Sequence, residues 1–163
     1  MSGPEATNVQ TSGEATTTVL LLSGPNLSLL GQREPDVYGT ATLEDHVAAA
    51  QQEALSHGLG IRSGQYDHEG SMVEQIHAAR GSCAGIIING GAFTHYSWAI
   101  HDALATFDGP VIELHLSNPG AREEFRRTSV LTPVSTAVIQ GLGGAGYPLA
   151  VRAMATLLGN LET

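Results

Sequence analysis

The alternation of short apolar runs with segments of helical period constrains the fold of this chain more than any other feature. Short apolar runs are typical of buried strands, whereas apolar residues spaced three and four apart are typical of helices that pack on a sheet. Repeated alternation of the two predicts an α/β fold, with a five-stranded parallel sheet covered by helices on both faces. Strands are expected at 18–23, 59–64, 84–89, 110–115 and 136–140, and helices at 42–57, 69–80, 97–107 and 144–158.

The chain is expected to form one domain. Its 163 residues match the size of a single domain, and its 42% of hydrophobic residues can fill an ordinary core. Residues 1–17 are polar and have no apolar period, so we expect a disordered tail followed by one domain over 18–160. No signal-peptide pattern and no run approaching the roughly 20 apolar residues of a membrane span is found. We therefore expect a soluble cytoplasmic protein.

Composition excludes several classes of function. The net charge of −9 argues against nucleic acid or an anionic membrane as a partner, because both require clustered cations. All seven basic residues are arginine, and the absence of lysine excludes Schiff-base chemistry, a pyridoxal phosphate anchor and a phosphate-loop lysine. Cys83 is the only cysteine, so it can form neither an intrachain disulfide nor a thiolate metal cage, and its apolar neighbours predict an inert core residue.

Arginines gather in two loop-like stretches of this otherwise acidic chain. Such local focusing of positive potential predicts a site for a small anion. A solvated helix face is an equally good interpretation for Arg127 alone. The four arginines are Arg33, Arg122, Arg126 and Arg127.

Polar side chains also follow the predicted strands, at the point where each strand ends. A loop punctuated by glycine and proline, 24–39, follows the first strand and holds Asn26 and Tyr38, in a position where binding and chemistry usually lie. Asn89 ends the third strand, and the two glycines after it let backbone N–H groups approach a bound oxygen, which favours ligand contact by His95 over an ordinary turn. One sequence does not fix the strand order, but a flavodoxin-like order 2-1-3-4-5 would bring these ends together in the crevice where such folds bind ligands.

Glu113 and His115 are the best candidates for an acid–base pair. Two residues apart on a strand, they share a face, so the carboxylate can orient the imidazole for general acid catalysis. We expect His46, His57 and His77 to be structural histidines with satisfied ring nitrogens, since they lie in helical segments without a partner pattern. The histidines show no HExxH or comparable ligand spacing, so no metal site is expected.

The segment 141–146 matches the pattern G-x-G-x-x-G after a strand and before a helix. A dinucleotide site would require a further strand with an acidic residue about 20 positions on, but only one helix and a short tail follow. Close packing of a helix on the sheet is the favoured interpretation, and a nucleotide-binding flavodoxin-like module is kept as an alternative.

Seven motifs occur in order between about residues 18 and 158: Gly24-Pro25-Asn26-Leu27, Arg33-Glu34-Pro35, Tyr38-Gly39, Asp67-His68-Glu69-Gly70, Asn89-Gly90 with Thr94-His95, Glu113-Leu114-His115-Leu116-Ser117-Asn118, and Ala121-Arg122-Glu123-Glu124-Phe125-Arg126. Together they resemble type II 3-dehydroquinate dehydratase. The resemblance implies a flavodoxin-like three-layer subunit without metal or organic cofactor, usually part of a homo-dodecamer of four trimers. It implies a hydro-lyase of the shikimate or quinate pathway, which removes water from 3-dehydroquinate by anti elimination through an enolate to give 3-dehydroshikimate.

The resemblance assigns the chemistry to five side chains. Tyr38 would be the base, and because a phenol is mostly protonated at neutral pH it needs a nearby cation, which Arg33 would supply. Asn26 would hold a water against the developing enolate oxygen. His115, oriented by Glu113, would protonate the departing hydroxyl.

The resemblance also assigns the binding of this small cyclic anion. Backbone N–H groups of Leu116 and Ser117 would bind the carboxylate, and Asp102 would reach in from a neighbouring subunit. Arg122, with Arg33 and the 31–39 loop, would form a lid that closes over the substrate. The side chains assigned to the ring hydroxyls are Asn89, His95 and Arg126.

Several positions depart from the usual family pattern without touching the expected acid or base. They leave open the subunit contacts and the choice of substrate. A paralogue that acts on an amino-3-dehydroquinate in secondary metabolism is therefore an alternative, as is a catalytically silent assembly module. The departures are Ser23, Tyr66, Tyr96, Trp98, Pro119-Gly120, and Thr128 and Val130 in the segment Thr128-Ser129-Val130.

Overall fold

Five parallel strands form the middle layer of the computed structural model, which describes residues 16–160. Their order is β2-β1-β3-β4-β5, which confirms the predicted flavodoxin-like order. Every strand matches its predicted range to within one residue. The strands are β1 (Thr17–Ser23), β2 (Leu59–Gln65), β3 (Gly85–Asn89), β4 (Val111–His115) and β5 (Ala137–Gln140). Because β1 already begins at Thr17, the predicted tail is one residue too long there, and its residues 1–15 lie outside the described part.

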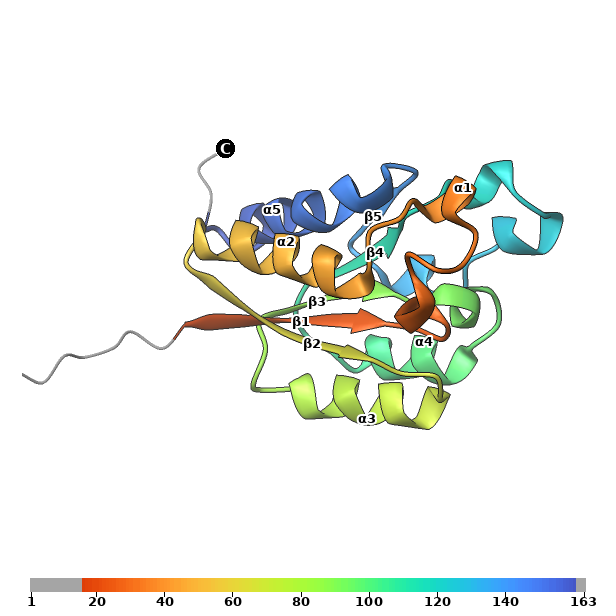
Figure 1. Ribbon diagram of the computed structural model, residues 1–163. Helices are drawn as coiled ribbons and strands as arrows, with labels where there is room; N and C mark the ends of the chain where they lie inside the picture. The colour runs from red at the N-terminus through yellow and green to blue at the C-terminus, as the bar shows by residue number, and fades with distance from the viewer. Residues whose placement is uncertain (1–15, 161–163) are drawn as a thin grey trace, which may run out of the picture.

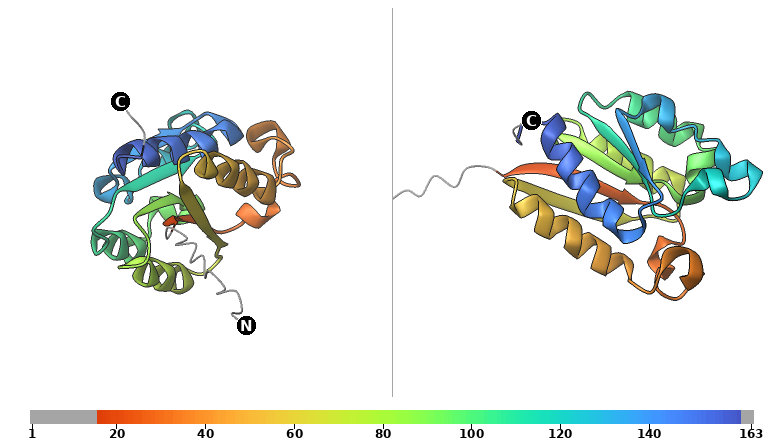
Figure 2. Two further views of the ribbon diagram at one scale, coloured as in Figure 1. Left: turned by 90° about the vertical axis from the view of Figure 1, so that its left-hand side faces the viewer. Right: turned by 90° about the horizontal axis from the view of Figure 1, so that it is seen from above.

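Two helical layers cover the sheet, with α2 and α5 on one face and α3 and α4 on the other (Figures 1 and 2). The alternation of side chains along β1 serves both layers, since Val19 and Leu21 pack in the core under α2 and α5, whereas Leu20 and Leu22 pack toward α3 and α4. The long helices are α2 (Leu43–Leu55), α3 (Glu69–Ala79), α4 (Trp98–Ala105) and α5 (Gly146–Leu157), and a single turn, α1 (Pro35–Tyr38), was not predicted.

Helix α2 shows how local sequence fixes an element. Thr42 accepts a hydrogen bond from the backbone N–H of Asp45 at 3.2 Å, and the Asp45 carboxylate accepts one from the N–H of Thr42 at 2.9 Å. This reciprocal capping box satisfies two amide groups that the first helical turn leaves free. Gly58, in the left-handed region at φ 68°, then lets the chain reverse into β2.

The carboxyl ends of β1, β3 and β4 lie side by side at one edge of the sheet. Ser23 is in register with Asn89, and the N–H of Gly24 donates to the carbonyl of Asn89 at 2.8 Å. The next residues approach so closely that a Cβ on Gly24 would lie 2.2 Å from the carbonyl oxygen of Gly90. Glycine is therefore required at position 24 for the two loops to meet.

None of the helices within residues 16–160 is long and apolar enough to span a membrane.

Candidate active site

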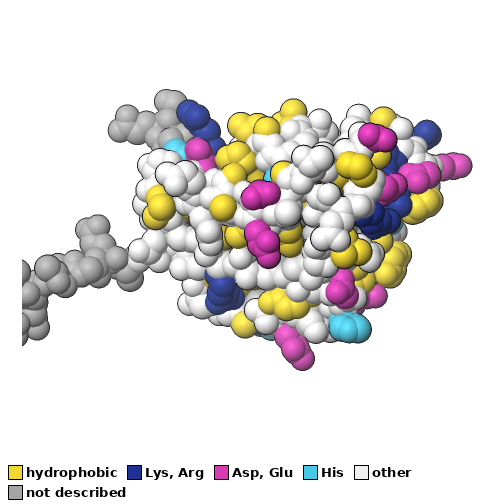
Figure 3. Space-filling view, in the orientation of Figure 1, with side chains coloured by type: hydrophobic (Ala, Val, Ile, Leu, Met, Phe, Trp, Pro, Cys, Tyr) yellow, Lys and Arg dark blue, Asp and Glu magenta, His cyan; other side chains and the backbone are white. Residues whose placement is uncertain are grey.

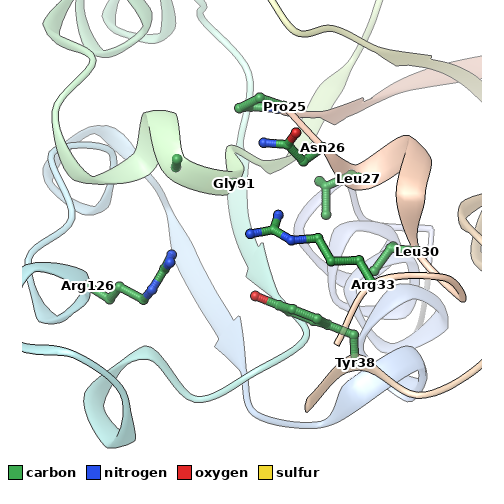
Figure 4. Close-up of a pocket in the computed structure, with 9 residues that line it drawn as sticks. Pro25, Asn26, Leu27, Leu30, Arg33, Tyr38, Gly91 and Arg126 are labelled. Atoms are coloured by element: carbon green, nitrogen blue, oxygen red, sulfur yellow. The ribbon is translucent and has the colours of Figure 1, made fainter. Parts of the chain in front are cut away.

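Two neighbouring cavities lie at the carboxyl ends of the strands, and both are lined by Leu27, Tyr38, Gly91 and Arg126. The first, of about 100 Å³, opens toward the loop that follows β1, and Figure 4 shows the side chains that line it. The second, of about 50 Å³, extends toward the end of β4. Arginine and acidic side chains gather on the surface at the end of the molecule that carries α1 (Figure 3). The predicted site residues that line one or both cavities are Asn26, Arg33, Tyr38, Asn89, His95, His115, Leu116, Ser117, Arg122 and Arg126.

Tyr38 is the last residue of α1, and its hydroxyl points into the first cavity (Figure 4). Nη1 of Arg122 donates a hydrogen bond to this hydroxyl at 2.5 Å, and the guanidinium lies 5.4 Å from the centre of the phenol ring. Arg33 lines the same cavity, but its Nε lies 3.7 Å from Glu34 and its side chain is 48% exposed. The cation bonded to the phenol is thus Arg122, which was predicted to be a lid residue, whereas Arg33 and Arg126 are the arginines that line the first cavity.

The predicted pair on β4 is formed as expected. Nε2 of His115 lies 2.7 Å from Oε1 of Glu113, and both side chains are buried. The hydroxyl of Ser129 donates to the same carboxylate oxygen at 2.7 Å, and that of Thr132 donates to the other at 2.5 Å. Burial acts to raise the pKa of Glu113, but the donors His115, Thr132 and Ser129 outweigh it and hold the pKa below its ordinary value.

An ionised Glu113 determines which ring nitrogen of His115 donates a proton to it. The carboxylate can only accept, so Nε2 of His115 carries the proton in this bond, and Nδ1 is left for proton transfer to a ligand. Ser129 and Thr132 were not predicted to be partners of Glu113. They follow it by 16 and 19 residues in a loop without period, and only the tertiary fold brings them against β4.

The side chain of Asn89 is oriented by hydrogen bonds to a buried tyrosine and to the backbone. Its Nδ2 donates to the hydroxyl of Tyr147 at 3.4 Å, and its Oδ1 accepts from the N–H of Gly91 at 3.3 Å. Burial raises the pKa of Tyr147, against the opposing hydrogen bonds of Asn89 and Ser23, so the phenol remains a neutral partner.

The expectation for His46 is wrong. Its ring stacks on Tyr147 with centroids 5.0 Å apart, and its buried Nε2 has no hydrogen-bond partner among the described residues. Burial lowers the pKa of His46, and Asp45 opposes this only in part. His57 does bond Glu53, at 2.8 Å, as expected of a structural histidine.

Two of the remaining predicted site residues are tied to neighbouring loops. Nδ1 of His95 lies 2.8 Å from the carbonyl oxygen of Thr128, and Nε of Arg126 donates to Glu123 at 2.9 Å. Asp102 is exposed on α4 and lines neither cavity.

The glycine segment at the start of α5 packs closely on the core. A Cβ on Gly144 would lie 2.5 Å from the ring of His46, and one on Gly146 would lie 3.0 Å from Leu114. These contacts agree with the packing interpretation of 141–146. Within residues 16–160, His, Cys, Asp and Glu side chains form no group of three that could hold a metal ion.

The strand order defines a flavodoxin-like α/β fold, and the cavities at the sheet edge hold a tyrosine bonded to an arginine and a histidine bonded to a glutamate. The family model for dehydroquinase class II matches residues 17–155, and the chain belongs to this family. A curated relative, 3-dehydroquinate dehydratase of Corynebacterium glutamicum, is 49% identical over 139 residues, which cover 85% of this chain and 96% of the relative. Another, 3-dehydroquinate dehydratase 2 of Pseudomonas putida, is 51% identical over 140 residues, which cover 86% of this chain and 94% of the relative.

A solved structure gives the same result for the fold. The type II dehydroquinase of Propionibacterium acnes matches with a TM-score of 0.83 at 44% sequence identity, over 86% of this chain and 97% of that one. The family resemblance stated from the motifs is thereby confirmed.

Proposed function

We propose that this chain is a hydro-lyase that removes water from 3-dehydroquinate to give 3-dehydroshikimate in the shikimate pathway. Membership of the dehydroquinase class II family supports the reaction. The single observation that carries the mechanism is that Tyr38 and His115 line one cavity, the phenol bonded to Arg122 and the imidazole to Glu113. A base with a cation and an acid with a carboxylate are the two groups that an elimination through an enolate requires.

Tyr38 takes the proton from the carbon next to the ketone. The Arg122 guanidinium stabilises the phenolate that this step requires, since an adjacent positive charge favours the ionised form of a phenol. The electron pair of the broken C–H bond moves toward the ketone oxygen, which becomes an enolate. A water held by Asn26 donates to that oxygen, and Arg33 adds positive potential in the same cavity.

His115 completes the elimination. As the enolate re-forms the ketone, the C–O bond at C1 breaks, and His115 donates a proton to the departing hydroxyl, which leaves as water. The new double bond is conjugated with the ketone. Tyr38 then holds one proton more and His115 one fewer than at the start, and exchange with solvent restores both.

Substrate recognition follows from the second cavity. The backbone N–H groups of Leu116 and Ser117 bind the carboxylate, and the ring hydroxyls contact Asn89, His95 and Arg126. Arg122, whose guanidinium bonds the phenol of Tyr38, is part of the lid over the substrate.

We further propose that Asp102 serves the site of a neighbouring subunit, in a dodecamer built from trimers. Its exposure on α4, beside exposed Tyr96 and Trp98, supports a contact on this face. Sedimentation of the purified chain tests the assembly, and cell fractionation tests the proposed cytoplasmic location.

The test of the function is an assay with 3-dehydroquinate, without added metal or nucleotide. Formation of the conjugated ketone is followed by its absorbance, and turnover is expected. Borohydride added during turnover should leave the enzyme active, because a chain without lysine has no amine side chain to trap. No absorbance change at high enzyme concentration contradicts the proposal and favours a silent assembly module, and binding of NAD or FMN in calorimetry would favour a nucleotide-binding module.

A second substrate deserves a parallel assay because of one further cavity. A hollow of about 630 Å³ adjoins His115, and its lining includes three positions that depart from the usual family pattern: Pro119, Gly120 and Thr128. An altered lining beside the proposed acid supports a substrate with one altered ring substituent. An amino analogue of 3-dehydroquinate is therefore the second candidate, and the ratio of the two kcat/KM values decides between them.

A further inference from the structure

Asn26 has a backbone conformation that residues other than glycine adopt infrequently. Its φ of 65° and ψ of −2° lie in the left-handed region, where the Cβ of an ordinary residue crowds the following carbonyl. Within the described residues Glu34 is the one other non-glycine residue with positive φ. Asparagine tolerates this region better than most other non-glycine residues, so a modest restraint is enough to hold it there.

Asp67 supplies a restraint on this conformation. Its Oδ1 accepts a hydrogen bond from the backbone N–H of Asn26 at 3.0 Å, across 41 residues of chain. The same oxygen accepts from Nε2 of Gln65 at 3.0 Å, and that Nε2 also donates to the carbonyl of Gly24 at 3.0 Å. The residues at the end of β2 therefore hold the loop after β1 by hydrogen bonds to Gly24 and Asn26, one on each side of Pro25.

The carboxyl group of Asp67 is ionised, as its role of hydrogen-bond acceptor requires. The N–H of Asn26 and then the amide of Gln65 lower the pKa of Asp67, so it is an ionised acceptor at neutral pH. It lines neither catalytic cavity, and so acts on the site through Asn26 rather than through substrate.

We propose that Asp67 is a positioning residue, which holds Asn26 in the left-handed conformation that aims its amide into the cavity; the catalytic part of this inference rests on the role of Asn26 in the proposed function. The amide of Asn26 points into the cavity toward the side of Gly91 (Figure 4). If the backbone of Asn26 relaxed to negative φ, its Cα–Cβ bond would point in another direction. The side-chain amide would then move away from the cavity. The water on the enolate oxygen would then lose its holder.

Four variants test the proposal by kinetics: Asp67→Ala, Asp67→Asn, Asn26→Ala and the double variant Asp67→Ala with Asn26→Ala. Asp67→Ala should lower kcat by about 10- to 100-fold, the size expected when an oxyanion donor is misplaced, and leave KM within about twofold. Asp67→Asn retains an acceptor oxygen and should keep most of the activity. Asp108→Ala, at an exposed aspartate in the loop before β4, is the matched control and should equal the wild type.

A merely structural role for Asp67 predicts a different kcat for the double variant. If Asp67 acts through Asn26, the double variant should be no slower than Asn26→Ala alone, because the side chain being positioned is already gone. Losses in kcat that multiply, or an Asp67→Ala variant with wild-type kcat, would overturn the proposal. If Asp67→Ala does not fold, Asp67→Ser, which is too short to reach the N–H, takes its place in the same cycle.

A readout without turnover separates this proposal from the proposed function. Amide hydrogen exchange at Asn26, followed by NMR, should accelerate at least tenfold in Asp67→Ala and much less in Asp67→Asn, since the first loses the acceptor of that N–H. If the wild type fails to convert 3-dehydroquinate, the function is wrong, yet faster exchange would still support the grip of Asp67 on Asn26. Unchanged exchange in Asp67→Ala overturns the positioning role even in an active enzyme.

Discussion

Arg122 and Tyr38 are 84 residues apart in the chain, and Nη1 of the guanidinium lies 2.5 Å from the phenol oxygen. The bond joins the segment after β1 to the segment after β4, and both segments line the cavities. The same contact therefore links the two segments and brings a positive charge to the proposed base.

Replacement of Arg122 by Gln should lower kcat by about 10- to 100-fold, because the phenolate loses its bonded cation. Steady-state rates with 3-dehydroquinate at pH 7 measure the effect. Arg80→Gln, at an exposed arginine after α3, is the matched control and should behave as the wild type. An Arg122→Gln variant with the wild-type kcat would remove Arg122 from the activation of the base.

Replacement of Tyr38 by Phe should abolish measurable turnover, a loss of about 100- to 10,000-fold for a missing general base. The fold should be unaffected, because the hydroxyl projects into a cavity rather than into the core (Figure 4). Turnover and the circular dichroism spectrum are the measurements. Tyr96→Phe removes a hydroxyl from a tyrosine that is 55% exposed and should retain activity. Tyr38→Phe with more than a tenth of the wild-type kcat would exclude Tyr38 as the base.

Replacement of Thr132 by Val should lower the free energy of unfolding at pH 7 by about 1.5 to 3 kcal/mol, the usual contribution of a hydrogen bond to a charged group. It should also weaken the acid sensitivity of the protein. The pKa of Glu113 lies below 4.5 in the folded state, so its stabilising contribution is present above pH 4.5 and is lost as the pH falls through the folded pKa. With one donor fewer, that loss becomes smaller.

Urea unfolding at pH 7 and at pH 4 measures the effect of Thr132→Val. Thr156→Val, at an exposed threonine of α5 that donates to the carbonyl of Arg152 at 3.1 Å, is the control. Equal losses of stability in the two variants would mean that the bond to Glu113 contributes no more than an ordinary one.

Replacement of His46 by Leu should raise the free energy of unfolding by about 1 kcal/mol at pH 8, because a buried nitrogen without a partner is removed. The gain should grow below pH 6.5. Burial lowers the pKa of His46 below the 6.5 of an unfolded chain, so the unfolded state binds the proton more tightly, and stability falls as the pH decreases from 6.5 to the folded pKa. The leucine variant lacks this decline.

Urea unfolding at pH 8 and pH 5.5 tests the prediction for His46. His77→Gln, at an exposed histidine of α3, is the control and should follow the wild-type curve. A parallel fall of stability in the His46→Leu variant and the wild type would show that other groups cause the acid sensitivity.

Much of the fold could be predicted from the sequence because its signals are local. Short apolar runs between segments of helical period predicted all five strands to within one residue at each end. The pair of Glu113 and His115 was found for the same reason, since two residues apart on a strand always share a face.

What could not be predicted depends on tertiary contacts. No local pattern links Arg122 to Tyr38, or Thr132 to Glu113, because each pair meets only when separate loops fold over the sheet edge. His46 was misjudged since helical period cannot tell whether a ring nitrogen will find a partner once Tyr147 covers it.

The chain enters β1 at Thr17, and α5 ends at Leu157, both at the end of the molecule opposite α1 and the cavities (Figure 1). A fusion partner joined directly at Thr17 or Leu157 would therefore attach on the far side of the molecule from the cavities. Immobilisation through such a partner would turn the cavities away from the support.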